Sequence, residues 1–180
     1  MADDVTGDPP STFVVQWATS VAPGLPAPPR ALDVAMGLGR HARAVAALGY
    51  RVFGVDVRVD VVRSAIDAAM ARGLVLRGWC ADLTVSALPR SRFDLIVVSR
   101  YLQRDLFPAL RETVTRDGVV LYETFTTAQR AKGTGPRSPD HLLEPGELLR
   151  RFEGFDVLFY EEVTEPDAVA RVAAKSLTLG

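Results

Sequence analysis

Residues 31–40 of the chain read Ala-Leu-Asp-Val-Ala-Met-Gly-Leu-Gly-Arg, a short apolar run followed by two glycines. The run is typical of a buried strand, and residues 40–48 have the pattern of a helix that ends at Gly49. Gly37 and Gly39 allow the backbone to pass close to a ligand without a side-chain clash. A strand, a glycine turn and a helix in this order predict the first unit of a sheet that is covered by helices.

The same alternation continues along the chain. Further strands are expected at residues 51–56, 74–79, 93–99 and 119–123, and helices at residues 59–70 and 106–114. After a helix near residues 146–152, the runs 155–160 and 168–179 are separated by a short turn, so we expect them to pair antiparallel. We therefore predict an α/β fold: a doubly wound, mostly parallel seven-stranded sheet with a C-terminal antiparallel hairpin.

The length of 180 residues is typical of one domain. We expect residues 1–10 to be a disordered tail and residues 11–180 to form a single domain. A polar segment at residues 124–143 is interrupted by two glycines and two prolines. Because a structureless stretch of this length inside a compact domain is usually functional, we interpret it as a lid over the active site.

Composition argues against several classes of protein. The formal net charge is −1, whereas a nucleic-acid binder normally has a basic excess, so no nucleic-acid partner is expected. Charges or prolines interrupt every apolar stretch before it could span a bilayer, so no membrane partner is expected. The single cysteine, Cys80, and an acidic N-terminus without a signal peptide favour the cytoplasm. The oligomeric state is left open by the sequence.

Three carboxylates follow or lie in successive strands. Parallel sheets bind ligands beyond the carboxyl ends of their strands, where Asp56 could accept hydrogen bonds from both hydroxyls of a ribose and Asp82 could accept the amine of an adenine. Asp33 would be favourable near a cation. Each residue also has a purely structural interpretation, since Asp56 could cap the next helix and Asp82 could belong to an ordinary turn. Together they indicate an adenosine cofactor.

Residues 37–42 also satisfy the loose nicotinamide fingerprint, with Asp56 near the position of its ribose acid. Three features count against a dehydrogenase. Asp33 would be unfavourable beside a pyrophosphate, Asp82 fits an adenine whose ribose is already held, and the chain has no room for a separate substrate domain. An NAD(P)-dependent reductase remains the alternative enzyme class.

A resemblance to a known family adds to this interpretation. Residues 32–40, 55–56, 81–83 and 93–97 resemble, in order, the motif series of class I S-adenosylmethionine-dependent methyltransferases. Residues 100–104, 121–125 and 139–143 are similar to small bacterial tellurite-resistance-type methyltransferases. The departure is Ala35, where the glycine-rich loop of the family usually begins with Gly.

The resemblance implies S-adenosylmethionine as cofactor and no metal. It implies that Asp33 and the loop from Ala35 to Gly39 face the methionine portion, that Asp56 holds the ribose, and that Asp82 with the Leu83 amide reads the adenine. The expected cofactor residues are Asp33, Ala35, Met36, Gly37, Gly39, Asp56, Val57, Asp82, Leu83 and Ser99, the last through its backbone.

The acceptor side is predicted around the ends of the later strands. Glu123 is the preferred residue for positioning or deprotonating the acceptor, although it could equally pair with an arginine. Arg100, Arg104, Arg130 and Arg137 could ring the opening and favour an anionic substrate, or could be solvated surface residues. Tyr101 and His141 complete the candidate catalytic set of Glu123, Arg100, Tyr101, Arg104 and His141.

The resulting hypothesis is methyl transfer to a heteroatom of a small molecule or oxyanion. Because the cofactor carries the reactivity in such a displacement, the protein mainly aligns the reactants and excludes water. A domain that binds S-adenosylmethionine for regulation, without catalysis, is the non-enzymatic alternative.

Overall fold

The computed structural model describes residues 8–177, which contain a seven-stranded sheet in the order β3-β2-β1-β4-β5-β7-β6. β1 to β5 run parallel, and β7 pairs antiparallel with both β5 and β6. The predicted sheet, with its C-terminal antiparallel hairpin, is confirmed. The strands are β1 (Arg30–Val34), β2 (Arg51–Asp56), β3 (Leu76–Cys80), β4 (Phe93–Ser99), β5 (Val114–Phe125), β6 (Phe155–Val163) and β7 (Val169–Ser176).

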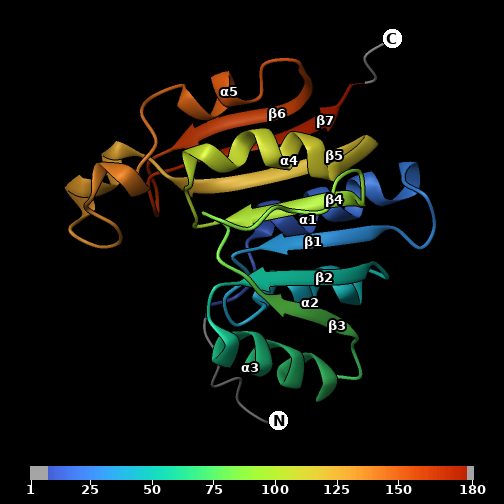
Figure 1. Cartoon of the computed structure of the whole chain (residues 1–180). Helices are drawn as coiled ribbons and strands as arrows, with labels where there is room; N and C mark the ends of the chain where they lie inside the picture. Colours follow the sequence, from blue (N-terminus) through green and yellow to red (C-terminus); the bar gives the residue numbers. More distant parts are fainter. Residues whose placement is uncertain (1–7, 178–180) are drawn as a thin grey trace.

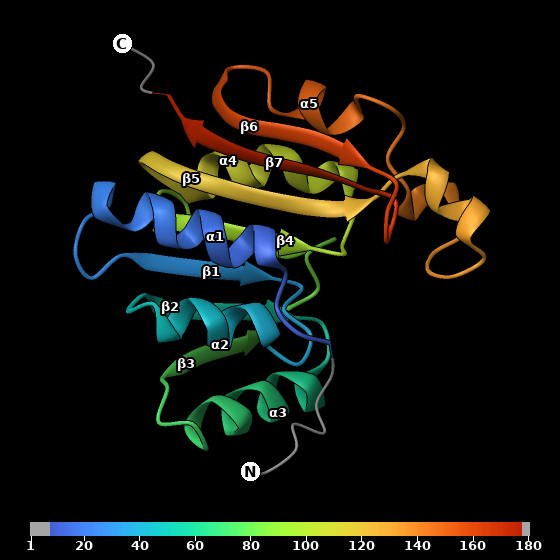
Figure 2. The same ribbon diagram turned by 180° about the vertical axis from the view of Figure 1, so that it is seen from behind.

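Helices cover both faces of the sheet (Figures 1 and 2). One face carries α1 (Thr12–Val21), α2 (Arg40–Ala47) and α3 (Val59–Met70), and the other carries α4 (Phe107–Thr113) and α5 (Glu147–Arg151). Two apolar clusters fill the space between these layers, one on each side of the sheet. This arrangement is expected for strands that must bury side chains on both faces.

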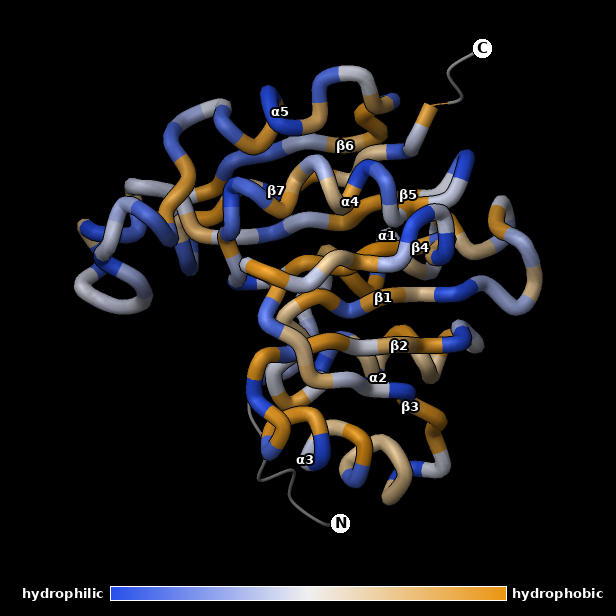
Figure 3. Tube along the Cα trace, in the orientation of Figure 1, coloured by the Kyte–Doolittle hydropathy of each residue, from blue (hydrophilic) through white to orange (hydrophobic). Residues whose placement is uncertain are grey.

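β4 lies at the centre of the sheet, and its position explains why its sequence is almost wholly apolar. Its residues from Phe93 to Val98 are all buried. Leu95 and Val97 belong to the cluster under α1 to α3, and Ile96 and Val98 belong to the cluster under α4 and α5. Each such side chain contributes roughly 1.5–3 kcal/mol to folding. Figure 3 shows the corresponding concentration of hydrophobic residues in the central strands.

Some element boundaries differ from the prediction. β5 extends to Phe125, so the polar segment begins only at residue 126. This segment contains two short 3-10 helices, η3 (Thr127–Lys132) and η4 (Pro139–His141), and an isolated bridge between Thr126 and Leu143 closes it. Figure 3 shows that it is largely hydrophilic. It projects beyond the end of the sheet, beside the carboxyl end of β5 (Figure 1).

Among residues 8–177, no helix is both long and apolar enough to cross a membrane. Of the segment expected to be a tail, residues 1–7 lie outside the described part of the chain. Residues 8–10 precede α1 and line the cavities at the carboxyl end of the sheet.

Candidate active site

Strand order reverses between β1 and β4, whose connections run to opposite sides of the sheet. Beyond the carboxyl ends of these strands lie three neighbouring cavities, of about 460, 310 and 410 Å³. We name them the Asp82 cavity, the Asp33 cavity and the Glu123 cavity after a residue that lines each. Arg100 lines all three, so they adjoin one another at the place where open α/β sheets bind ligands.

The glycine turn after β1 lines the Asp33 cavity through residues 35–38, and its first residue, Ala35, also lines the Asp82 cavity. Gly37 and Gly39 have φ angles of +53° and +74°, which favour glycine. A Cβ atom on Gly39 would also lie 3.0 Å from the Cβ atom of Ala65 in α3. Ala35 has a φ of +52°, which explains why a glycine is the easier residue there. Because its glycines have no side chains, the turn leaves its backbone accessible to a ligand.

Asp33 points into the cavity named after it from the buried strand β1. The residue is only 3% exposed, and its Oδ2 atom accepts a hydrogen bond from the Ala42 amide at 2.9 Å. Burial raises the pKa of Asp33 to about 7, against the lowering effect of that amide. A buried carboxylate that is costly to ionise is a suitable partner for an incoming cation.

Asp56 ties the second strand to the glycine turn. Its Oδ2 atom accepts a hydrogen bond from the Gly37 amide at 2.9 Å, and its Oδ1 atom accepts one from the Arg58 amide at 3.1 Å. Its carboxylate does not cap α3, whose N-cap residue is Arg58. Each oxygen of a carboxylate can accept two hydrogen bonds, so Asp56 keeps the capacity to bind hydroxyl groups in the Asp82 cavity.

Asp82 lies across the same cavity, with Val57, Leu83 and Tyr101 in the lining. Its Oδ1 atom accepts hydrogen bonds from the Thr84 hydroxyl and amide, at 2.7 and 2.9 Å, and these lower the pKa of Asp82. One oxygen of Asp82 therefore stabilises the turn, as the structural interpretation of this residue expected. The Oδ2 atom makes no hydrogen bond to any residue from 8 to 177, which leaves it available to a ligand.

Tyr101 contacts this half of the site and not the Glu123 cavity. Its hydroxyl donates to Gln103 Oε1 at 2.5 Å, and Gln103 Nε2 donates to the Leu83 carbonyl at 3.1 Å. The side chain that was expected on the acceptor side therefore lies beside Asp82. Cys80 is exposed, and its thiol donates to the Val57 carbonyl at 3.1 Å.

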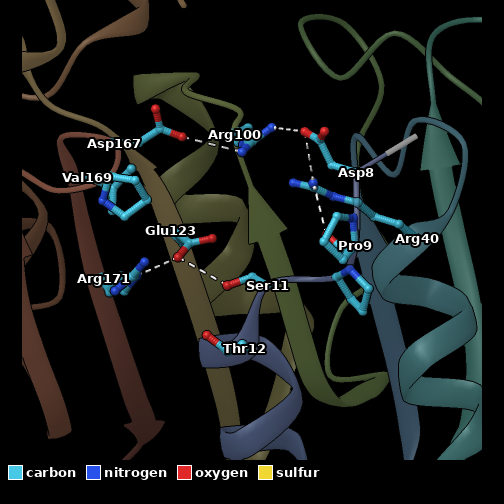
Figure 4. Close-up of a pocket in the computed structure, with 12 residues that line it drawn as sticks. Asp8, Pro9, Ser11, Thr12, Arg40, Arg100, Glu123, Asp167, Val169 and Arg171 are labelled. Carbon is cyan, nitrogen blue, oxygen red and sulfur yellow. Dashed lines mark hydrogen bonds and ion pairs between the residues drawn. The ribbon is translucent and has the colours of Figure 1, made fainter. Parts of the chain in front are cut away.

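Glu123 is the centre of the third cavity. It is 6% exposed, and its Oε2 atom accepts hydrogen bonds from Arg171 Nε at 2.5 Å and from the Ser11 hydroxyl at 3.1 Å (Figure 4). Ser99 lies 3.5 Å away on the other carboxylate oxygen. Glu123 is thus paired with an arginine, which was one of the two roles expected for it. Its carboxylate also lines the cavity.

His41 anchors the segment before α1. The residue is 3% exposed, and its Nε2 atom accepts a hydrogen bond from the Ser11 amide at 3.1 Å. Burial, assisted by the charges of Arg40 and Arg100, lowers the pKa of His41 to about 3. It is therefore neutral near pH 7 and acts as an acceptor that positions residues 8–11 over the site.

Two residues predicted for catalysis lie away from the cavities. Arg104 donates to Glu147 from Nε and Nη2, at 2.8 and 2.9 Å, and to the Leu142 carbonyl at 2.9 Å. These contacts connect the 126–143 segment to η2 (Arg104–Leu106) and α5. His141 is exposed in η4 and lines none of the three cavities. The structure therefore brings Glu123 and Arg100 together, but not Arg104 or His141.

The structure also adds residues that sequence patterns did not identify. Arg171 reaches Glu123 because the two are directly opposite each other in the antiparallel pairing of β5 with β7. Arg40 and Asp8 line both the Asp33 cavity and the Glu123 cavity. Arg40 directly follows Gly39 in the sequence, and this position beside the glycine turn was the one local signal that it could line the site. The register that places Arg171 has no local signature.

Comparisons with known proteins bear on the domain and its fold. Residues 31–117 match the family model described as a methyltransferase domain. None of the curated proteins matches the chain in sequence. Solved structures of similar fold include TehB from Haemophilus influenzae, with 17% identity and a TM-score of 0.68 over 89% of this chain. The match covers 62% of the TehB chain.

Two further solved structures of similar fold are S-adenosylmethionine-dependent methyltransferases. The methyltransferase from Mesorhizobium loti has 20% identity and a TM-score of 0.68, over 89% of this chain and 97% of that one. The methyltransferase from Aquifex aeolicus has 20% identity and a TM-score of 0.70, over 94% and 95% of the two chains. Similarity at this level of identity establishes a common fold. Residues 31–117 of this chain are therefore similar to a methyltransferase domain, and the chain has the fold of S-adenosylmethionine-dependent methyltransferases of known structure.

Proposed function

We propose that the chain is an enzyme that transfers a methyl group from S-adenosylmethionine to a heteroatom of a small molecule or oxyanion. The observation that carries the proposal is the buried carboxylate of Asp33, which lines a cavity beside the glycine turn and whose pKa is raised by burial. A cationic ligand relieves the cost of ionising such a group, whereas a pyrophosphate would increase it.

The residues of the site suit each part of this cofactor. Asp33, with the loop of Ala35, Met36, Gly37 and Gly39, would face the methionine portion, and all but Gly39 line the Asp33 cavity. The carboxylate of Asp56 would bind the ribose hydroxyls. Asp82, Leu83 and Val57 would surround the adenine in the adjoining cavity.

When bound, the cofactor supplies an electrophilic methyl group on a sulfonium. The protein then needs to hold the acceptor in line and keep water away. Ser99 lines the Asp33 cavity and its hydroxyl lies 3.5 Å from Glu123, so the two cavities meet at these side chains. Glu123 would position the acceptor from the opposite side. Arg40, Arg100 and Arg171 line the Glu123 cavity and support an anionic or oxyanion acceptor.

The first test measures cofactor binding by calorimetry. S-adenosylhomocysteine is titrated into the wild-type protein and into Asp56→Ala, with NAD and NADP in parallel titrations. We expect binding of S-adenosylhomocysteine that weakens at least tenfold in the variant, because a carboxylate hydrogen-bonded to both ribose hydroxyls contributes roughly 1.5–3 kcal/mol per bond. Tight binding of NAD without binding of S-adenosylhomocysteine would support the reductase instead.

The second test measures turnover. The protein is incubated with radiolabelled S-adenosylmethionine and a panel of acceptors that includes tellurite, selenite and small thiols, phenols and carboxylates. Transfer to at least one acceptor is expected. Binding without transfer to any of them would support the regulatory alternative.

Other expectations from the sequence belong to the same proposal. We propose a single domain from residue 11, a cytoplasmic enzyme without nucleic-acid or membrane partners, and a lid role for the polar segment that ends at residue 143. Contacts from Arg104 to the Asp140 and Leu142 carbonyls would let this segment respond to changes beside β4, which supports the lid role.

A further inference from the structure

The carboxylate of Asp8 lies between two arginines at the boundary of the Asp33 and Glu123 cavities (Figure 4). Its Oδ2 atom is 2.6 Å from Arg100 Nη1 and 3.5 Å from Arg40 Nη1. Arg40 is the first residue of α2, and Arg100 directly follows β4. Two elements that are distant in sequence therefore direct guanidinium groups at one acidic oxygen.

An anion between these two arginines is electrostatically favourable. Burial lowers the pKa of Arg40, the nearby charge of Arg100 lowers it further, and the carboxylate of Asp8 opposes both effects. Asp167 also approaches Arg100, at a longer distance of 3.5 Å. Arg100 holds a φ of +55°, an uncommon conformation for a residue with a side chain. The backbone thus accepts strain at the residue that directs this guanidinium into the site.

The Asp8 carboxylate is placed so that an external anion can displace it. The Asp8 side chain is 64% exposed, and it precedes α1 on a short segment instead of belonging to the sheet. The segment is held by hydrogen bonds from Arg40 Nη1 to the Pro9 carbonyl, at 3.2 Å, and from the Ser11 amide to His41, at 3.1 Å. Breaking the exposed ion pairs would leave the anchor at Ser11 intact.

We propose that the space between Arg40 and Arg100 is an oxyanion subsite for the acceptor, and that Asp8 occupies it as an internal competitor until the acceptor displaces it. The ligand is a carboxylate or a tetrahedral oxyanion, since guanidinium groups bind both through paired hydrogen bonds. This assignment rests on the proposed function, because it takes the Glu123 cavity as the acceptor side. It further assigns Asp8 a role in controlling access to that cavity.

The test uses malonate as the carboxylate probe and inorganic phosphate as the tetrahedral probe. Each is titrated into the full-length protein saturated with S-adenosylhomocysteine, and binding is followed by the NMR signals of the arginine Nε–H groups. The variants are Asp8→Asn and the matched control Asp60→Asn. Asp60 is 65% exposed and pairs with Arg58 at 2.6 Å, but lies outside the three cavities.

We expect at least one probe to bind about two- to fivefold more tightly to Asp8→Asn than to the wild type, the range for loss of an exposed competing ion pair. Asp60→Asn should bind like the wild type. The double variant Asp8→Asn/Arg100→Gln should lose the gain. The probe that responds distinguishes a planar carboxylate from a tetrahedral oxyanion.

Several outcomes would overturn the subsite. They are equal affinity in Asp8→Asn and wild type, no binding of either probe, or exclusion of the probes by S-adenosylhomocysteine, which would assign the two arginines to the cofactor. A failure of S-adenosylhomocysteine itself to bind is seen in the saturation step and counts against the proposed function. The same titrations without it then test the subsite alone.

Discussion

Asp33 should make cofactor binding depend on pH. In the ligand-free protein its pKa is raised to about 7 by burial, from an ordinary value of 3.8. An ammonium or sulfonium group beside it would favour the charged form and lower the pKa again. Binding therefore releases a proton from Asp33 when the pH is below about 7, and affinity rises as the pH increases toward that value.

The size of the effect follows from the shift. One pKa unit corresponds to about 1.4 kcal/mol, so complete relief of the shift would change the affinity about tenfold for each pH unit below 7. Between pH 5 and pH 8 the dissociation constant of S-adenosylhomocysteine should fall by up to about a hundredfold. His41, with its pKa lowered to about 3, does not titrate in this range.

The same residue predicts the stability of the ligand-free protein. Because the folded state binds the proton of Asp33 more tightly than the unfolded state does, this group makes the free energy of unfolding fall as the pH rises from about 4 to about 7. Asp33→Asn should remove this slope. It should also remove most of the pH dependence of binding, since the amide carries no titrating charge.

The assay is isothermal calorimetry with S-adenosylhomocysteine from pH 5 to pH 8, in two buffers of different ionisation enthalpy. The buffers reveal the number of protons released, for which we expect nearly one at pH 6. His141→Gln serves as a control substitution outside the three cavities. An unchanged pH profile in Asp33→Asn, or binding without proton release at pH 6, would refute the argument that Asp33 faces the cation.

Three further predictions concern the neighbouring contacts. Glu123→Gln should lower the free energy of unfolding by roughly 1–3 kcal/mol in urea denaturation, because it removes the buried charge beside Arg171, which keeps its ion pair with Glu161. The affinity for S-adenosylhomocysteine should stay within about twofold, and an equal loss of that affinity would argue against an acceptor role. Gly54→Ala should lower the free energy of unfolding by roughly 1–3 kcal/mol, because the new Cβ atom would overlap Met36 Sδ. The double variant with Met36→Ala should recover part of this free energy. If it recovers none, the strain does not come from the contact with Met36. Glu147→Gln should speed limited proteolysis of the loop after β5. Burial raises the pKa of Glu147, but hydrogen bonds from Arg104, the Glu144 amide and Arg151 outweigh this effect and hold the pKa at about 2. The contact therefore stabilises the protein above about pH 4.5, and this stabilisation is lost as the pH falls toward 2. An unchanged cleavage rate in the variant would show that the contact does not hold the loop.

Much of the fold could be predicted from local patterns. β4 matches the predicted range of residues 93–99, since an apolar run bounded by polar residues can be read without knowing its neighbours. The glycine turn after β1 was equally predictable, because positive φ angles favour glycine independently of the rest of the chain. The end of β5 was misplaced, since Thr124 and Phe125 extend the strand only by pairing with β7.

The cofactor half of the candidate site depends on the same local signals. Asp33, Asp56 and Asp82 follow from strand ends, and parallel strands bring such ends together at one edge of the sheet. Arg104 looked like an acceptor residue from its place after β4. In the structure its guanidinium is bound by Glu147, which lies 43 residues later in the sequence.

The sequence alone thus determined the order of strands and helices, the glycine turn and the acidic residues around it, because each depends on backbone preferences and on hydrophobic period over a few residues. Tertiary structure decided which charges meet. Arg171 reaches Glu123 through antiparallel register, and Asp8 reaches Arg40 and Arg100 across the end of the sheet. Ion pairs act over a few ångströms in space and leave no mark on sequence spacing, so the acceptor side became visible only in the folded chain.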